Sequence, residues 1–192
     1  MEQAYAEARQ DRATVMWFED EASFYRNATV ARAWAPRGRR QPHARSRPGT
    51  NACWRMAAGL DPVGGRLNYR RYTRIDAPLI GQFYAQLAAV SAAAERIYLV
   101  MDNWPVHHHP NATNAVAGDD RVSILWLPTY SPWLNPTEKV WKWVRQRFSH
   151  MHEDVEDMDQ FGQHLAATLD QAGQDPQALL QYTATGKSKL YS

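Results

Sequence analysis

Two motifs within residues 97–148 decide the fold: I-Y-L-V-M-D-N-W-P-V-H at 97–107 and V-S-I-L-W-L-P-T-Y-S-P-W-L-N-P-T-E-K-V-W at 122–141. The first is an apolar run that ends abruptly in Asp102, and the second leads into Glu138 at the start of an amphipathic helix. Upstream, the apolar residues 15–18 run directly into three acidic residues at 19–21. Acidic side chains at strand ends and helix starts, far apart in sequence, predict a carboxylate cluster that holds a divalent metal.

The pattern outside these motifs predicts one α/β domain with a mixed sheet flanked by helices. Strands are expected at residues 14–18, 23–26, 53–60, 66–72, 97–101 and 122–127, the first two forming a hairpin and the last two buried on both faces. Helices are expected at residues 2–12, 78–94, 107–117, 135–148 and 154–172, with a weakly structured tail after Pro176. Strands first, followed by alternating helices and strands, are typical of a mixed sheet covered by helices.

The composition indicates a folded protein without a membrane segment. The chain has 192 residues, of which 44% are hydrophobic and eight are Trp, enough for one domain with a sizeable core. No apolar stretch approaches the roughly 20 residues of a membrane span, and the charged N-terminus lacks the apolar region of a signal peptide. Cys53 is the single cysteine, which excludes an intramolecular disulfide and fits a reducing compartment. We therefore expect a cytoplasmic protein with no membrane partner.

Positive charge is concentrated in one segment. Residues 26–74 contain twelve arginines and one acid, Asp61, whereas the rest of the chain has ten Lys or Arg against nineteen Asp or Glu. Four aromatic residues are interleaved with these arginines: Trp34, Trp54, Tyr69 and Tyr72. Guanidinium groups match phosphate oxygens and aromatic rings stack on bases, so nucleic acid is one expected partner. A solvated segment whose arginines balance acids elsewhere is the alternative, and charge alone does not separate the two.

Asp102 and Glu138 each have a structural explanation that competes with a site. Asp102-Asn103 can close its strand with an Asx turn, and this explanation weighs equally with a functional one. Asn135 suits a helix N-cap and Pro136 the first helical position, which places Glu138 where a capping box needs it. Taken in isolation, capping is the better explanation for Glu138, although a face turned toward the sheet remains open.

The acidic cluster at residues 19–21 cannot serve one site with all of its members. Side chains alternate across a strand, so Asp20 points with Phe18 while Glu19 and Glu21 point to the opposite face. Spacing alone does not decide which set faces a site.

Three adjacent histidines invite a metal interpretation that geometry disfavours. On a regular helix, neighbouring side chains diverge by roughly 100°, so residues 107–109 cannot together ligate one ion. We expect polar residues at a helix start, with His107 alone near a site.

The motifs resemble a known family. D-N-W-P-V-H, L-P-T-Y-S-P-W-L-N-P-T-E-K-V-W, the early D-E at residues 20–21 and R-A-W-A-P-R-G at residues 32–38 look like the mariner-like branch of DDE transposases, and more closely its bacterial insertion-sequence members. The resemblance runs from about Val15 to Phe148 and implies an RNase H-like fold. It implies three carboxylates, Asp20, Asp102 and Glu138, that bind two Mg²⁺ ions, with Mn²⁺ as a substitute. It selects Asp20 over its acidic neighbours and makes Glu138 a ligand that can also cap its helix.

The resemblance further implies a substrate and a division of the chain. DNA would be cut and its 3′-OH ends joined by transesterification, with a homodimer as the expected assembly. Supporting or DNA-contacting roles are expected for seven residues: Asn103, His107, Arg37, Arg39, Arg40, Lys142 and Arg145. The domain division expected is a helical segment at residues 1–13, the RNase H-like catalytic domain at 14–150, and a C-terminal helix and tail at 151–192 that pack on the same domain.

Two departures from the family pattern qualify this expectation. Residues 1–13 are too short for the helix-turn-helix modules that read transposon ends, so a separate helix-turn-helix subunit is an expected partner. Trp104 and Trp133 occupy motif positions where smaller or polar residues are expected. The alternative functions are a catalytically inactive DNA-binding relic of a split or truncated transposase and a general RNase H-like nuclease.

Overall fold

A five-stranded mixed sheet forms the centre of the computed structural model, which describes residues 1–29, 37–38, 46–149 and 156–185. In the order β3-β2-β1-β4-β5, the strands are β3 (Leu67–Tyr72), β2 (Cys53–Leu60), β1 (Thr14–Tyr25), β4 (Arg96–Met101) and β5 (Val122–Trp126). The helices are α1 (Glu2–Gln10), α2 (Ala77–Ala89), α3 (Pro110–Thr113), α4 (Thr137–Val144), α5 (Met158–Gly173) and α6 (Pro176–Thr183). The predicted mixed sheet with flanking helices is confirmed.

The long central strand β1 joins an antiparallel half of the sheet to a parallel half. Its first part pairs in parallel with β4, from Thr14 opposite Arg96 to Phe18 opposite Val100. Its second part pairs antiparallel with β2, from Phe18 to Tyr25. The predicted hairpin of residues 14–18 and 23–26 is therefore wrong, because β2 provides hydrogen-bond partners along the acidic residues and keeps the strand continuous.

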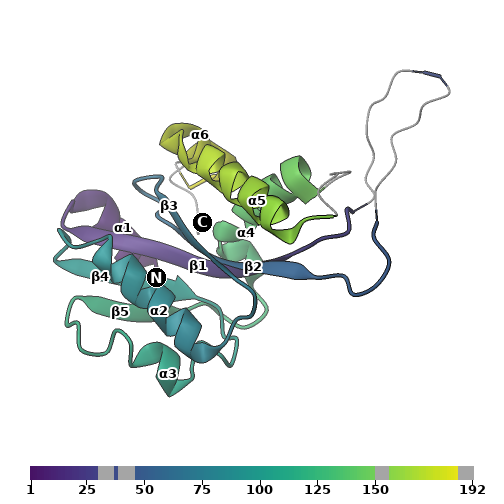
Figure 1. Cartoon of the computed structure of the whole chain (residues 1–192). Helices are drawn as coiled ribbons and strands as arrows, with labels where there is room; N and C mark the ends of the chain where they lie inside the picture. Colours follow the sequence, from purple (N-terminus) through teal and green to yellow (C-terminus); the bar gives the residue numbers. More distant parts are fainter. Residues whose placement is uncertain (30–36, 39–45, 150–155, 186–192) are drawn as a thin grey trace.

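The two faces of the sheet are covered by different helices. One face packs under α2 and α3 in a core that includes Trp17, Leu99 and Phe83. The other packs under α4, α5 and α6 at one end and under α1 at the other, where Met16 and Phe18 are fully buried. Figure 1 shows α2 and α3 beside β4 and β5, with α5 and α6 grouped around α4.

Three predicted elements differ from the observed ones. The strand at residues 122–127 was expected to be buried, but among the described residues β5 lies at one edge of the sheet, pairs with β4 alone and is half exposed. The helix expected at residues 107–117 is reduced to the single turn α3, because Pro110 fits only the first turn of a helix. The tail after Pro176 instead forms α6, whose Asp175 side chain accepts a hydrogen bond from the backbone N–H of Ala178.

The helix that begins near Glu138 also departs from a regular α-helix. After α4 ends at Val144, the residues Arg145–Ser149 continue as a π-helical turn, with Phe148 buried in the core. Within the described part of the chain, the helices are too short or too polar to cross a membrane.

The close contact between α2 and α3 can be tested at Gly81. A Cβ atom there would lie 2.6 Å from the backbone oxygen of Asn111 and 3.1 Å from that of Ala112. Gly81→Ala should lower the free energy of unfolding by about 1–3 kcal/mol, despite the better helix propensity of Ala, because backbone atoms cannot move aside easily. Thermal unfolding measures this change, and Gln82→Ala, on the exposed side of α2, is the control; equal melting temperatures for both variants would contradict the packing.

Candidate functional site

The parallel pairing of β1 and β4 brings two acidic residues to the same level of the sheet. Phe18 is paired with Val100, and Asp20 and Asp102 each follow two residues later in their segments. Both chains run in the same direction, so continuing this alignment places the two acids next to each other, at the carboxyl end of β4. The strand register thus produces the first half of the site.

The third acid is brought to the same place by hydrogen bonds that tie the start of α4 to β1. The Asn135 side chain donates to the backbone oxygen of Glu19 over 2.8 Å, and the Thr137 hydroxyl donates to that of Phe18 over 2.7 Å. Both side chains are buried. Glu138 follows directly on the exposed side of the first turn of α4, so its position is fixed relative to Asp20.

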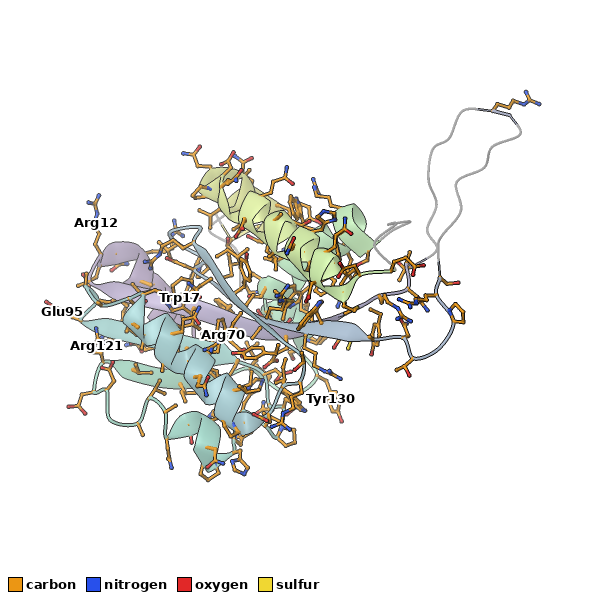
Figure 2. All side chains as sticks on the ribbon, in the orientation of Figure 1. Arg12, Trp17, Arg70, Glu95, Arg121 and Tyr130 are labelled. Atoms are coloured by element: carbon orange, nitrogen blue, oxygen red, sulfur yellow. The ribbon has the colours of Figure 1, made fainter. Side chains whose placement is uncertain are left out.

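Asp20, Asp102 and Glu138 line one cavity of about 310 Å³. The other lining residues come from the turn after β4 and from the connection between β5 and α4: Asn103, Trp104, Leu127, Pro128, Thr129, Tyr130, Ser131, Pro132 and Asn135. Tyr130 marks this rim at the lower right of the molecule in Figure 2. Three segments that are far apart in sequence therefore form one acidic cavity.

The structural role considered from sequence is observed for Asp102 but not for Glu138. Asp102 does form an Asx turn, because its Oδ1 accepts a hydrogen bond of 2.8 Å from the backbone N–H of Trp104. Glu138 does not close a capping box, because the backbone N–H of Asn135 already donates to the oxygen of Pro132. Asn135 instead contributes its own side-chain oxygen to the N–H of Thr137. Glu138 is therefore available to the cavity.

The cavity is electrostatically unfavourable for Asp20 when no cation is bound. Burial, followed by the nearby carboxylates of Glu138 and Asp102, raises the pKa of Asp20 to about 8. The indole N–H of Trp141 donates to Asp20 Oδ2 over 2.9 Å and opposes this rise. Near neutral pH, Asp20 holds a proton unless a positive charge replaces it.

Asp102 is held in the opposite electrostatic state by a buried histidine. His107 Nε2 lies 3.2 Å from Asp102 Oδ1, and this hydrogen bond, helped by that from Trp104, lowers the Asp102 pKa against the effect of partial burial. The Tyr84 hydroxyl lies 2.6 Å from His107 Nδ1, and burial raises the pKa of Tyr84, so the hydroxyl keeps its proton. With that proton donated to Nδ1, a neutral imidazole carries its own proton on Nε2 and donates it to Asp102.

A second group of acids lies on the opposite face of β1, behind the cavity. Ligand atoms of Glu19, Glu21 and His107 lie within 4.8 Å of one another, and Glu19 is buried. Burial raises the pKa of both carboxyls well above the usual range, helped by repulsion from Glu21 and Asp20 at Glu19 and from Asp20 and Asp102 at Glu21. Because both nitrogens of His107 are engaged by Tyr84 and Asp102, His107 supports Asp102 here and has no free lone pair for an ion.

The remaining residues with expected roles are placed as follows. Asn103 donates to the backbone oxygen of Leu127 and so joins the turn after β4 to the segment after β5. Lys142 and Arg145 are exposed on and after α4, the Arg145 guanidinium lying 5.7 Å from the centre of the Phe24 ring. Arg37 is exposed. Arg39 and Arg40 lie outside the described residues.

Sequence reasoning missed two side chains that hold the acids. The indole of Trp141 contacts Asp20, a role that the sequence motif containing Trp141 did not reveal. Tyr84 lies within the helix expected at residues 78–94, where nothing in the sequence signalled the contact of its hydroxyl with His107.

Comparison with known proteins gives this arrangement a family. Residues 15–180 match the family described as DDE superfamily endonuclease. The chain belongs to this family. An uncharacterized 39 kDa protein of insertion element IS630 from Shigella sonnei is 22% identical to this chain over 138 residues. These residues are 72% of this chain and 40% of that protein. The chain thus spans less than half the length of this curated relative.

Solved structures of transposases have a fold similar to that of this chain. The catalytic domain of Mos1 mariner transposase matches with a TM-score of 0.59 and 12% identity, over 95% of this chain and 81% of that one. The mariner Mos1 paired end complex with Mg matches with a TM-score of 0.64 and 13% identity, over 95% of this chain and 55% of that one. The sheet and its flanking helices therefore form an RNase H-like fold, as the motifs predicted.

The contact between His107 and Asp102 predicts an effect on metal affinity. His107→Leu removes the Nε2 donor and should weaken Mn²⁺ binding by roughly 10–100-fold, the usual effect of losing a residue that orients a ligand. His107→Gln keeps an N–H near the same place and should retain most of the affinity. Titration followed by electron paramagnetic resonance measures the bound ion.

His109→Leu is the matched control, because it makes the same change at an exposed histidine two residues away. Unchanged Mn²⁺ affinity in folded His107→Leu would show that His107 does not support Asp102.

Proposed function

We propose that the chain is a transposase catalytic domain that cleaves DNA strands and transfers their 3′-OH ends in a metal-dependent reaction. Asp20, Asp102 and Glu138 are its proposed catalytic residues and metal ligands. The observation that carries this proposal is their convergence on one cavity of about 310 Å³ from β1, β4 and α4 of a DDE superfamily fold. Cleavage and strand transfer share one chemistry, displacement at phosphorus, so one set of carboxylates serves both.

The cavity fits Mg²⁺, with Mn²⁺ as a substitute. The three side chains offer only hard carboxylate oxygens, the donors that Mg²⁺ prefers. The raised pKa of Asp20 indicates that the carboxylates lack a compensating positive charge, which a cation would supply. Asp20, Asp102 and Glu138 would hold two such ions, which would supply activation of the attacking oxygen and stabilisation of the leaving oxygen in an in-line displacement.

The carboxylates of Asp102 and Asp20 are oriented by the protein before any substrate arrives. Trp104 and His107 both hold Asp102 Oδ1, which leaves Oδ2 as the oxygen available to a ligand. Trp141 holds Asp20 Oδ2 in the same way. This preorganisation reduces the movement needed when the acids bind a cation and a phosphate together.

DNA is the proposed substrate, both as transposon ends and as target. Exposed basic side chains near the site, including Lys142 and Arg145, are proposed to contact its phosphate backbone. We further propose that the protein acts in the bacterial cytoplasm as a homodimer, together with a separate helix-turn-helix subunit that reads the ends.

Nicking of supercoiled plasmid tests this function. Wild-type protein should nick in Mg²⁺ or Mn²⁺ and not in EDTA, and Asp102→Asn should lose activity by at least about 100-fold while it stays folded, because a neutral amide is a poor ligand for a hard cation. Agarose gels measure nicking and circular dichroism measures folding.

Exposed Asp120→Asn is the matched control and should nick like the wild type. Nicking by Asp102→Asn at the wild-type rate would refute the site. DNA binding by the wild type that falls steeply with salt, without nicking in any metal, would favour a DNA-binding relic.

A further inference from the structure

Three large aromatic side chains are exposed on the two segments that border the acidic cavity. Tyr130 is 90% exposed, Trp133 is 73% exposed and Trp104 is 39% exposed. Trp104 follows β4, and the other two belong to the connection between β5 and α4. A large aromatic ring exposed to water forgoes the favourable burial of its apolar surface. Three such rings beside one cavity therefore indicate a binding surface.

The backbone holds Tyr130 outward at an energetic cost. Its φ angle is 59°, in the left-handed region that Gly adopts readily and residues with a bulky side chain adopt rarely. The connection that carries it is anchored at one end by Asn103 bound to the oxygen of Leu127, and at the other by Asn135 bound to that of Glu19. The exposed ring is therefore displayed by a segment fixed at both ends.

Two of these rings share the cavity with the acids. Trp104 and Tyr130 line the same space as Asp20, Asp102 and Glu138. Trp104 also stacks edge-on against His107, with ring centres 5.4 Å apart, which fixes its position relative to Asp102. The described residues that line the cavity include no Lys or Arg, so this wall suits a flat, uncharged group better than a phosphate.

We propose that Trp104 and Tyr130 form a stacking site for an unpaired DNA base next to the phosphate at the carboxylates. This proposal rests on the proposed function, because a strand whose phosphate reaches the acids must place its neighbouring base against this wall. In an intact duplex, both faces of each base are covered by the adjacent bases. A base in a single-stranded overhang can turn its face onto an aromatic ring, whereas the base at a blunt end is held in its pair.

The site therefore confers a preference among DNA substrates. DNA with a short single-stranded overhang should bind more tightly than the same duplex with a blunt end. The expected difference is about 5–150-fold in Kd, the range found for one base stacked on an aromatic side chain. Recognition of this kind depends little on base identity, because every base has a π face.

Fluorescence titration with 2-aminopurine in the overhang tests the proposal. The measurement uses the full chain in Ca²⁺, a hard cation that carboxylates bind, and a gel confirms that the oligonucleotide stays intact. Wild-type protein should bind the overhang more tightly than the blunt end and should quench the 2-aminopurine emission when its ring stacks. Tyr130→Phe should keep both properties, because the ring remains.

Tyr130→Gly should lose the overhang preference and the quenching, yet it should fold at least as well because Gly readily adopts positive φ. Trp104→Leu should show the same loss by an independent change. Tyr182→Ala, at a half-exposed tyrosine on α6, is the matched control and should bind as the wild type does.

Three results would overturn the proposal. One is an equal preference for the overhang in the wild type and Tyr130→Gly, and another is no preference in the wild type. The third is a change in the sedimentation coefficient of the protein alone in Tyr130→Gly, because the ring would then contact a second copy of the chain. Plasmid nicking without an overhang preference would refute the stacking site alone, whereas stacking without nicking in Mg²⁺ or Mn²⁺ would refute the proposed function alone.

Discussion

Repulsion among carboxylates held close together is the constraint on which the rest of this structure depends. Parallel alignment of β1 and β4 places Asp20 beside Asp102, and burial together with repulsion from Glu138 and Asp102 raises the pKa of Asp20 to about 8. A fold whose stability is marginal can hold such a group only if other contacts fix the strands that carry it. Here β1 is the central strand, paired on both sides and buried under helices on both faces.

The two acids on neighbouring strands are stabilised in different ways. Asp102 receives hydrogen bonds from Trp104 and His107 and is held as a carboxylate. Asp20 receives hydrogen bonds from the backbone of Glu21 and the indole N–H of Trp141, but burial and the nearby carboxylates outweigh them, and it retains a proton. The acids in the cavity repel one another less when one of them is protonated than when all are ionised. A cation that displaces the proton would still stabilise the ionised acids.

Local sequence patterns predicted the fold better than the details of the site. The strand at residues 53–60 was predicted with its observed bounds, because Asp61 and the glycines that follow end it sharply. The hairpin within residues 14–26 was wrong, because only the pairing with β2 keeps a strand intact through three acids. Alternation along β1 separated Asp20 from Glu19 and Glu21, but it could not say which face meets α4, since that depends on tertiary packing. The support of Asp102 by His107 and Tyr84 joins three segments, and no local pattern encodes it.

The position of Glu138 shows how a feature of local structure can serve the site. Glu138 lies in the first turn of α4, where the helix dipole gives a partial positive charge that stabilises a carboxylate by about 0.3–1 kcal/mol. Bringing a third acid toward Asp20 and Asp102 costs less from a helix start than from any other part of a helix. The preference of Glu for this position, which made capping the better explanation from sequence alone, is thus also a reason why the third carboxylate comes from the start of α4. Because Asn135 and Thr137 tie that start to β1, the helix end that favours the acid is the same one that the fold holds at the cavity.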